Sequence, residues 1–229
     1  MPRRLIVNAD DLGYDPAIDR GILEAHARGI VTSATAMVET PFAAVAMRDA
    51  PRTLGLGLHL VLEEGLGGAA LEGAIRRQLD RFQALRGAAP THLDGHKHRH
   101  ARPEALPAVI RVAREAGLPV RAMDAALRAR LRAEGVPTAD RFLGDADRRP
   151  AWTAEGLLAA LASLEDGVTE LMAHPGYRPS HARTSFGVER EAELAALCDP
   201  RARAALAASG TILTSYAELR PSPGRGGGA

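Results

Sequence analysis

The sequence predicts an α/β fold built as a (β/α) barrel, related to the TIM barrel, with about seven parallel strands in a single domain. Short apolar or β-branched runs alternate with longer stretches of helical periodicity along the chain. Repeated strand–helix units of this kind place successive strands parallel to one another. The length of 229 residues also suits one α/β barrel of roughly 200–250 residues. An open doubly wound sheet fits the same alternation, and periodicity alone does not exclude it.

The first elements follow from local sequence signals. Arg4–Asn8 is a short β-branched apolar run typical of a strand. Pro16–Arg28 has apolar residues at helical spacing and is followed by a glycine that ends the helix. Two more strand-like runs, Ile30–Val38 and Leu54–Leu62, flank a short helix that begins at a proline, Pro41–Asp49. The order is therefore strand then helix from the start.

The remaining elements continue this alternation. Helices are expected at Leu71–Leu85, Arg102–Glu115, Met123–Arg132, Thr153–Leu164 and Val188–Ala207. Strands are expected at Thr91–Asp94, Pro119–Arg121, Thr169–Ala173 and Thr211–Thr214. The barrel domain is thus assigned to residues 1–220, and the Pro/Gly-rich stretch 221–229, which has almost no apolar character, to a frayed tail.

Composition narrows the class of protein. The chain has 29 Lys and Arg residues against 28 Asp and Glu residues, so it has almost no net charge that would attract nucleic acid or an anionic membrane. A single cysteine, Cys198, excludes an intramolecular disulfide and a multi-cysteine metal site. No apolar run reaches the roughly 18 residues of a membrane span, and no signal peptide is recognised. We expect a cytoplasmic enzyme, and a homodimer is common at this size.

Polar residues gather where the predicted strands end, and parallel barrels build their sites at the carboxyl ends of strands. Such residues follow the first, third, fourth and sixth of the predicted strands. By contrast, His26 on the first helix has the pattern of ordinary exposed surface. The strand-end residues are Asn8, Asp10, Asp11, His59, His92, Asp94, His96, His98, His100 and His174.

A metal site is predicted at Asp11, His59 and His96. One carboxylate and two imidazoles from separate strands can converge on a divalent ion and leave positions open for water and substrate. Each residue alone is more often a helix cap or a hydrogen-bonded core histidine, but the three together favour a metal. This ligand set suits Zn²⁺, Co²⁺, Ni²⁺ or Mn²⁺ by softness, and an open, water-rich site also holds Mg²⁺.

Acid and base roles are assigned to the neighbouring groups Asp10 and His174. Two adjacent carboxylates on one ion would repel each other, so Asp11 is placed on the metal and Asp10 is left as the base that activates water. The reverse assignment of the two aspartates is the main alternative. His174 precedes a Pro–Gly turn and is the candidate general acid for a leaving nitrogen. A turn histidine bonded to backbone is the other interpretation.

The fourth strand is followed by three alternating histidines. In an extended chain His96, His98 and His100 share one face, although only one need bind metal. His98 is a candidate substrate-binding residue, with a surface loop as the alternative for both His98 and His100. Asp94 could orient a metal-binding imidazole without binding the metal itself, or cap a turn. His92, earlier in the strand, is expected to be buried structure.

The candidate site also includes a pair of residues that directly follow the Pro–Gly sequence. Tyr177 and Arg178 follow His174 at a position suited to contacting a polar substrate. Aromatic and basic residues are also common in ordinary loops, so the pattern is a weak one.

Four motifs follow one another along the chain: NADDLG from Asn8, GLHL from Gly57, THLDGHKHRH from Thr91 and MAHPGY from Met172. Their combination and order resemble the YdjC-like carbohydrate deacetylase family, which includes the chitooligosaccharide deacetylases. The resemblance spans roughly residues 4–219. It implies a barrel-like fold, one divalent cation such as Mg²⁺ or Zn²⁺, and hydrolysis of an N-acetyl group from an amino sugar or short oligosaccharide with release of acetate.

The resemblance implies the same roles as the residues themselves: Asp10 looks like the base and His174 like the acid, and the family's metal ligands match Asp11, His59 and His96. Two departures stand out. Leu12 replaces a phenylalanine that is frequent in the family, which keeps an apolar anchor. The stretch after His59, from Val61 to about Ala70, is shorter than in many members, so a more open site is expected.

Other functions fit the motifs less well than a deacetylase does. A metal-dependent sugar isomerase on a similar barrel usually uses more carboxylates and a lysine, and this chain has only Lys97. A phosphoesterase would need a richer two-metal ligand set. A non-catalytic sugar-binding protein would need neither Asp10 nor His174. The motif set therefore favours the deacetylase.

Overall fold

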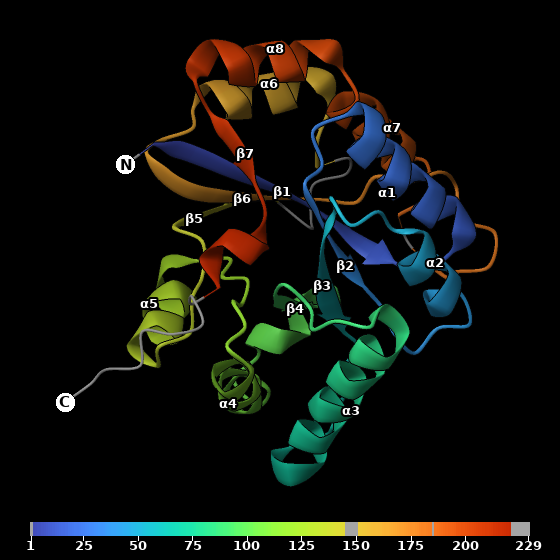
Figure 1. The fold of residues 1–229 in the computed structure, drawn as a ribbon, viewed down its shortest axis with the longest axis vertical. Helices are drawn as coiled ribbons and strands as arrows, with labels where there is room; N and C mark the ends of the chain where they lie inside the picture. Colours follow the sequence, from blue (N-terminus) through green and yellow to red (C-terminus); the bar gives the residue numbers. More distant parts are fainter. Residues whose placement is uncertain (1, 145–150, 185, 221–229) are drawn as a thin grey trace.

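Seven parallel strands form one curled sheet, and helices cover its outside (Figure 1). The computed structural model describes residues 2–144, 151–184 and 186–220; the predicted tail 221–229 lies outside them. The strands are β1 (Arg3–Leu12), β2 (Ser33–Ala36), β3 (Gly55–Leu60), β4 (Leu93–Gly95), β5 (Arg141–Leu143), β6 (Gly167–Ala173) and β7 (Ile212–Thr214).

The sheet has the order β4-β3-β2-β1-β6-β5, and every pairing is parallel. β7 pairs with Arg4–Ile6 of β1, while β2 pairs with β1 from Asn8 onward, so the two share one side of the longest strand. The predicted barrel-like α/β fold is confirmed. Within the described residues no ladder joins β4 to β5, so the sheet is a half-barrel and not a closed barrel.

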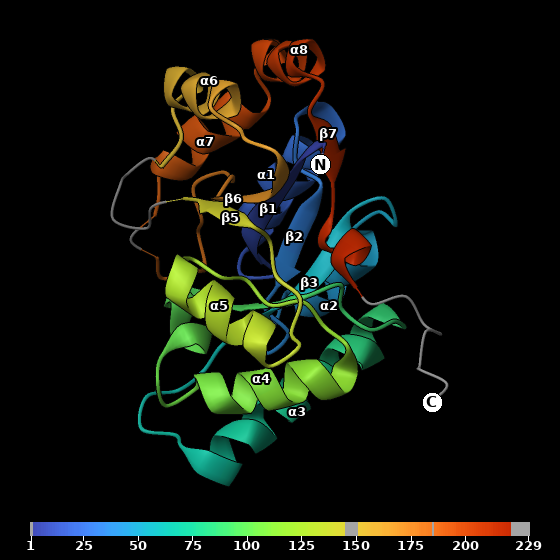
Figure 2. The same ribbon diagram turned by 90° about the vertical axis from the view of Figure 1, so that its left-hand side faces the viewer.

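The helices pack in groups around the sheet. Figures 1 and 2 show α6 and α8 together at one end of the molecule and α3 and α4 at the other. In the described part of the chain, no helix combines the length and the apolar character needed to cross a membrane. The helices are α1 (Pro16–Arg28), α2 (Ala43–Asp49), α3 (Gly68–Arg86), α4 (Leu106–Ala116), α5 (Ala125–Ala133), α6 (Ala154–Ala162), α7 (Glu189–Leu197) and α8 (Pro200–Ser209), with 3-10 turns η1 (His96–Ala101) and η2 (Tyr216–Leu219).

Some predicted elements are wrong. Pro119–Arg121 is not a strand, because it makes only an isolated bridge between Val120 and Leu93. β5 was not predicted, since three residues carry little periodic signal. The helix expected at Val188–Ala207 is two helices: Asp199 caps α8 and Pro200 occupies its first turn, where a proline cannot continue the preceding helix.

Two glycines allow close approaches that position the site. A Cβ on Gly21 of α1 would lie 2.4 Å from Cα of Gly176, so the helix and the turn after His174 pack backbone to backbone. A Cβ on Gly57 of β3 would lie 2.3 Å from the ring of His92. His92 is fully buried and stacks on Tyr216 with ring centroids 3.9 Å apart, which makes it a structural residue, as expected.

Candidate active site

Two adjacent aspartates at the end of β1 both reach the interior of the half-barrel. Neighbouring strand residues normally point to opposite faces. Here the pairing of β1 with β2 shifts register between Ala9 and Leu12, and Asp11 has φ of 75°, a left-handed conformation that aspartate tolerates better than most residues. Asp10 and Asp11 are therefore both buried and both line one cavity.

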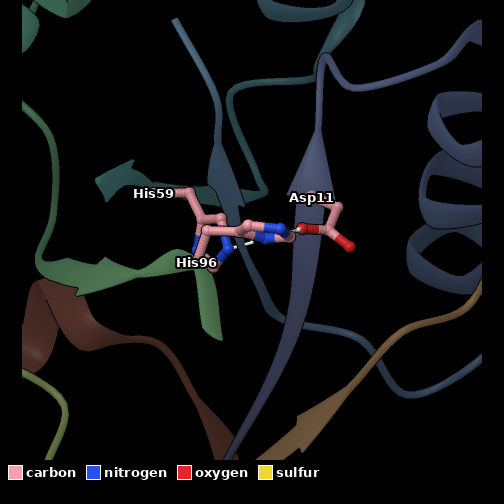
Figure 3. A group of neighbouring side chains, drawn as sticks. All are labelled: Asp11, His59 and His96. Atoms are coloured by element: carbon pink, nitrogen blue, oxygen red, sulfur yellow. Dashed lines mark ion pairs between the residues drawn. The ribbon is translucent and has the colours of Figure 1, made fainter. Parts of the chain in front are cut away.

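Asp11, His59 and His96 converge from three different segments (Figure 3). We call these residues the Asp11 cluster. Asp11 Oδ1 lies 3.4 Å from Nε2 of His59 and 3.3 Å from Nδ1 of His96. One ligand atom from each residue lies within 4.8 Å of the others. Asp11 Oδ1 is buried and accepts no hydrogen bond from the described residues, so it fits a cation held with the two imidazoles.

Neighbouring groups orient the Asp11 cluster. Asp94 Oδ1 lies 2.7 Å from Nδ1 of His59, an arrangement that turns Nε2 of the ring toward Asp11. Burial lowers the pKa of His59, but Asp94 and Asp11 outweigh it and raise that pKa to about 10. Arg190 from α7 donates to the other oxygen of Asp11 at 2.5 Å. Burial opposes ionisation of Asp11, yet Arg190 and the imidazoles hold its pKa well below the usual range.

Asp10 lies beside the Asp11 cluster and is held by Arg121. Both of its oxygens accept from Arg121 at 2.7 Å, and Asn8 Nδ2 donates to Oδ1 at 2.9 Å. Burial raises the pKa of Asp10, but Arg121 overcomes that effect and lowers it. A second group of possible metal ligands consists of Asp10, His59 and Asp94. The negative charges of its two carboxylates are already balanced, because Arg121 pairs with both and His59 pairs with Asp94.

Arg121 connects Asp10 to a deeper network. Its Nη1 lies 2.9 Å from Asp94, and its Nε donates to Glu170 at 2.8 Å. Glu170, in the middle of β6, also accepts a hydrogen bond from the hydroxyl of Tyr216. Burial raises the pKa of Glu170 to about 7 despite these donors. One fully buried guanidinium therefore serves three carboxylates.

His174 closes the other side of the site. Its Nε2 lies 3.9 Å from Oδ2 of Asp10, and its side chain is 14% exposed, so the ring is accessible from the cavity. Its backbone N–H donates to Glu193 at 2.7 Å, and Phe186 packs against the ring with centroids 4.9 Å apart. These contacts fix an imidazole next to Asp10, in the cavity that the Asp11 cluster also lines.

A cavity of about 440 Å³ contains these groups. It gathers acidic, imidazole and cationic side chains, and it is more polar than a typical drug-like pocket. The lining residues are Asp10, Asp11, Tyr14, His59, Gly95, His96, Lys97, His98, His174, Arg183, Thr184, Phe186 and Arg190.

The histidine segment after β4 is folded differently from the prediction. An extended chain was expected to place His96, His98 and His100 on one face, but the chain turns as η1 with φ of 54° at both Lys97 and His98. His96 joins the Asp11 cluster and His98 lines the cavity. Burial lowers the pKa of His98 to about 4, so this ring is neutral at neutral pH. His100 is fully buried, with Nε2 lying 3.3 Å from the carbonyl of Arg121.

Tyr177 and Arg178 do not reach the cavity. The hydroxyl of Tyr177 donates to Glu24 of α1 at 2.6 Å, and the guanidinium of Arg20 lies over its ring. Arg178 is exposed, and its backbone N–H donates to Glu191. Neither side chain is among those that line the cavity. His26, expected on the surface, is half-buried with both ring nitrogens hydrogen-bonded.

Several site residues were not predicted from the sequence. Arg121 ends a segment beside β4, so the strand-end argument that selected the histidines could have found it. Arg190 lies on a helix, and Tyr14 and Arg183 lie in loops. No local sequence signal marks these three as lining residues.

Comparison with known proteins agrees with this geometry. The YdjC-like protein family model matches residues 4–71 and 66–208. The chain belongs to the YdjC-like family. A carbohydrate deacetylase of Geobacillus stearothermophilus is 37% identical over 96% of the chain and 99% of its own length. A chitooligosaccharide deacetylase of Serratia marcescens is 31% identical over 96% of the chain and 100% of its own length.

A solved structure shows the same fold. A protein from Enterococcus faecalis V583, described provisionally as a cellobiose-phosphate cleavage protein, superimposes with a TM-score of 0.84. It is 27% identical and is covered completely, with 96% of this chain aligned. The resemblance expected from the four motifs therefore holds along most of the chain.

Proposed function

We propose that this YdjC-like protein is a metal-dependent hydrolase that removes the N-acetyl group from an amino sugar or a short N-acetylated oligosaccharide and releases acetate. One observation carries the proposal: Oδ1 of Asp11, which accepts no hydrogen bond from the described residues, faces the imidazoles of His59 and His96 inside a polar cavity. Relatives named carbohydrate deacetylase and chitooligosaccharide deacetylase support it over nearly the whole chain.

Asp11, His59 and His96 would hold one divalent cation. When bound, such an ion polarises an acyl oxygen and lowers the pKa of water. Two imidazoles and a carboxylate suit Zn²⁺, Co²⁺, Ni²⁺ or Mn²⁺, and Mg²⁺ follows from the family resemblance. Asp94 supports the set by fixing the ring of His59, and Arg190 by fixing the carboxylate of Asp11.

Asp10 is the proposed general base. Arg121 keeps its carboxylate ionised, and the carboxylate lies next to the Asp11 cluster, so it can accept a proton from the attacking water. The bidentate pair also fixes its direction. Adjacent aspartates thus take different roles, because Oδ1 of Asp11 faces two imidazoles whereas both oxygens of Asp10 accept from the guanidinium of Arg121.

His174 is the proposed general acid. Its Nε2 faces the cavity near Asp10, where it can donate a proton to the leaving nitrogen of the amino sugar. His98 is neutral and lines the same cavity, which suits hydrogen bonding to sugar hydroxyl groups. We assign no substrate contact to Tyr177 or Arg178, because neither lines the cavity.

Other functions fit the site less well. A two-metal phosphoesterase needs a second set of free ligands, and the carboxylates of Asp10 and Asp94 are occupied by Arg121 and His59. A sugar isomerase usually uses a lysine, and Lys97 is the single lysine in this sequence. A protein that only binds sugars does not need an imidazole beside an ionised aspartate. We place the enzyme in the cytoplasm because Cys198 is the only cysteine.

The decisive experiment measures acetate release by metal-stripped protein reloaded separately with Zn²⁺, Co²⁺, Ni²⁺, Mn²⁺ or Mg²⁺. The substrates are N-acetylglucosamine, its phosphate and chitooligosaccharides, and inorganic phosphate is measured in parallel. Acetate that depends on the metal is the expected result. Phosphate release without acetate would identify a phosphoesterase, and neither product from folded, loaded protein would contradict the proposed reaction on these substrates.

A further inference from the structure

Asp15 has more hydrogen-bonding partners than its helix-capping role requires. It is fully buried, and its Oδ1 accepts from the backbone N–H of Ala17 at 2.8 Å, which caps the first turn of α1. Asp124 shows what a cap alone looks like: at the start of α5 its Oδ1 accepts from Leu127 at 2.8 Å. One oxygen is enough for capping, which leaves the second oxygen of Asp15 to be explained.

Oδ2 of Asp15 holds a distant segment of the chain. It accepts from three successive backbone N–H groups, those of Ser180, His181 and Ala182, at 3.1, 2.7 and 3.0 Å. Successive N–H groups that converge on one anion form a concave binding site, and each bond is assisted by the charge. We call this arrangement the Asp15 clamp. It ties the 180–182 segment, which has no regular secondary structure, to the start of α1.

A second bond fixes the same segment. The hydroxyl of Tyr14 donates to the backbone carbonyl of Arg183 at 2.8 Å. Arg183 and Thr184 line the cavity, as Tyr14 does. Both anchors therefore come from residues 14 and 15, only a few positions after Asp11, and they hold one wall of the cavity in register with the Asp11 cluster.

We propose that Asp15 is a positioning residue that determines specificity: the Asp15 clamp sets where Arg183 and Thr184 meet the sugar, and thereby how tightly the substrate is held. The proposal rests on the proposed deacetylase function, which supplies the sugar. Asp15 lies outside the cavity lining and takes no part in the proton transfers. Its effect should appear in substrate binding, whereas loss of Asp10 should appear in turnover.

The test uses Asp15→Ser in the full-length, metal-loaded protein. Serine is as good an N-cap as aspartate but has only one side-chain oxygen, so the cap remains and the clamp is lost. Asp124→Ser makes the same change at a cap without a clamp. Amide hydrogen exchange of peptides that cover Ser180–Ala182 is measured first, and acetate release from N-acetylated chitooligosaccharides second.

We expect faster exchange over Ser180–Ala182 in Asp15→Ser, together with KM raised roughly tenfold and kcat within about threefold of wild type. Asp124→Ser should match wild type in both measurements. Unchanged exchange, unchanged KM, or a fall in kcat at constant KM would each overturn the proposal. If Asp15→Ser does not fold, Asp15→Asn replaces it, because the amide keeps the shape and removes the charge, and the same directions are expected.

The two proposals fail in different ways. If the wild-type protein releases no acetate, the deacetylase function fails, while the exchange measurement needs no substrate and still decides whether Asp15 holds the segment. If the wild type is active and Asp15→Ser keeps its KM, the deacetylase stands and the specificity role is wrong.

Discussion

Arg121 and Asp10 form a bidentate ion pair at the inner end of the cavity, with both N···O distances 2.7 Å, although 111 positions separate them in the chain. The same guanidinium contacts Asp94 and Glu170. The ionisation and direction of the proposed base therefore depend on a residue that does not itself line the cavity.

Arg121→Met should destabilise the fold strongly. It leaves the buried carboxylate of Asp10 without its cation and leaves Asp94 with His59 alone, and breaking a buried pair in this way costs about 3–5 kcal/mol. Arg111→Met, which breaks an exposed pair with Glu72, should cost far less, because water and salt screen that pair. Urea unfolding of both variants provides the comparison, and equal losses would show that Arg121 contributes no more than a surface ion pair.

Asp10→Asn should separate catalysis from metal binding. The Asp11 cluster is untouched, so metal content should equal that of wild type, while turnover falls by roughly 10²–10⁴, the usual effect of losing general acid–base catalysis. Asp80→Asn, on the exposed face of α3, is the control and should change neither quantity. Wild-type turnover in Asp10→Asn would remove Asp10 from the role of base.

His59→Ala and His96→Ala should each release the metal. Each change removes one of three ligands and leaves Asp11 with a single imidazole partner. His26→Ala, remote from the cavity, should keep wild-type metal content. Elemental analysis after dialysis measures the stoichiometry. Retention of a full equivalent of metal by both cluster variants would show that the ligands lie elsewhere.

The stability of the metal-free protein should depend on pH through His92. Burial lowers the pKa of this imidazole to about 3, against about 6.5 when unfolded. Between these values the unfolded state binds the additional proton, so His92 makes stability rise with pH and fall on acidification below about 6.5. From pH 7 to pH 5 its contribution falls by on the order of 2 kcal/mol.

His92→Gln isolates this effect from groups with opposite sign, such as Glu170, whose pKa is raised to about 7. Urea unfolding at pH 5 and pH 7 should show a smaller stability loss on acidification in His92→Gln than in wild type. His181→Gln, an exposed histidine, should behave like wild type. The same pH dependence in all three proteins would refute the buried neutral state of His92.

Gly21→Ala should damage both stability and activity. Its new Cβ would lie 2.4 Å from Cα of Gly176, so α1 and the turn that carries His174 must move apart. Gly73→Ala in α3 has room for its Cβ and should stabilise the protein by roughly 0.5–1 kcal/mol, as expected for glycine in a helix. Thermal unfolding and acetate release test the pair. An increase in stability for both would mean that the close approach at Gly176 relaxes freely.

The sequence predicts the parallel α/β architecture well because strand and helix periodicity repeat over the whole chain. It also brings Asp11, His59 and His96 into one candidate set, since the carboxyl ends of parallel strands share an edge. These residues lie close together in the structure, and their role on a metal stays a proposal.

The remaining features of the fold and the site could not be predicted from local sequence patterns. β5 has only three residues, and the positive φ at Lys97 and His98 is set by tertiary packing that propensity does not describe. The contact of Arg190 with Asp11 spans 179 positions. Tyr177 was expected to contact the substrate, but its hydroxyl bonds to Glu24 of α1 instead. The direction of a side chain after a Pro–Gly turn depends on what the turn packs against.

Within the described residues no backbone ladder crosses from β4 to β5, so side chains make the contacts across this opening. In a closed barrel this join consists of backbone hydrogen bonds, which tolerate almost any side chain. Here Arg121, anchored beside β4, reaches across to Glu170 on β6 and to Asp10 on β1. Charged side chains therefore bridge this opening, and the residue at position 121 links the scaffold there to the carboxylate proposed as the base.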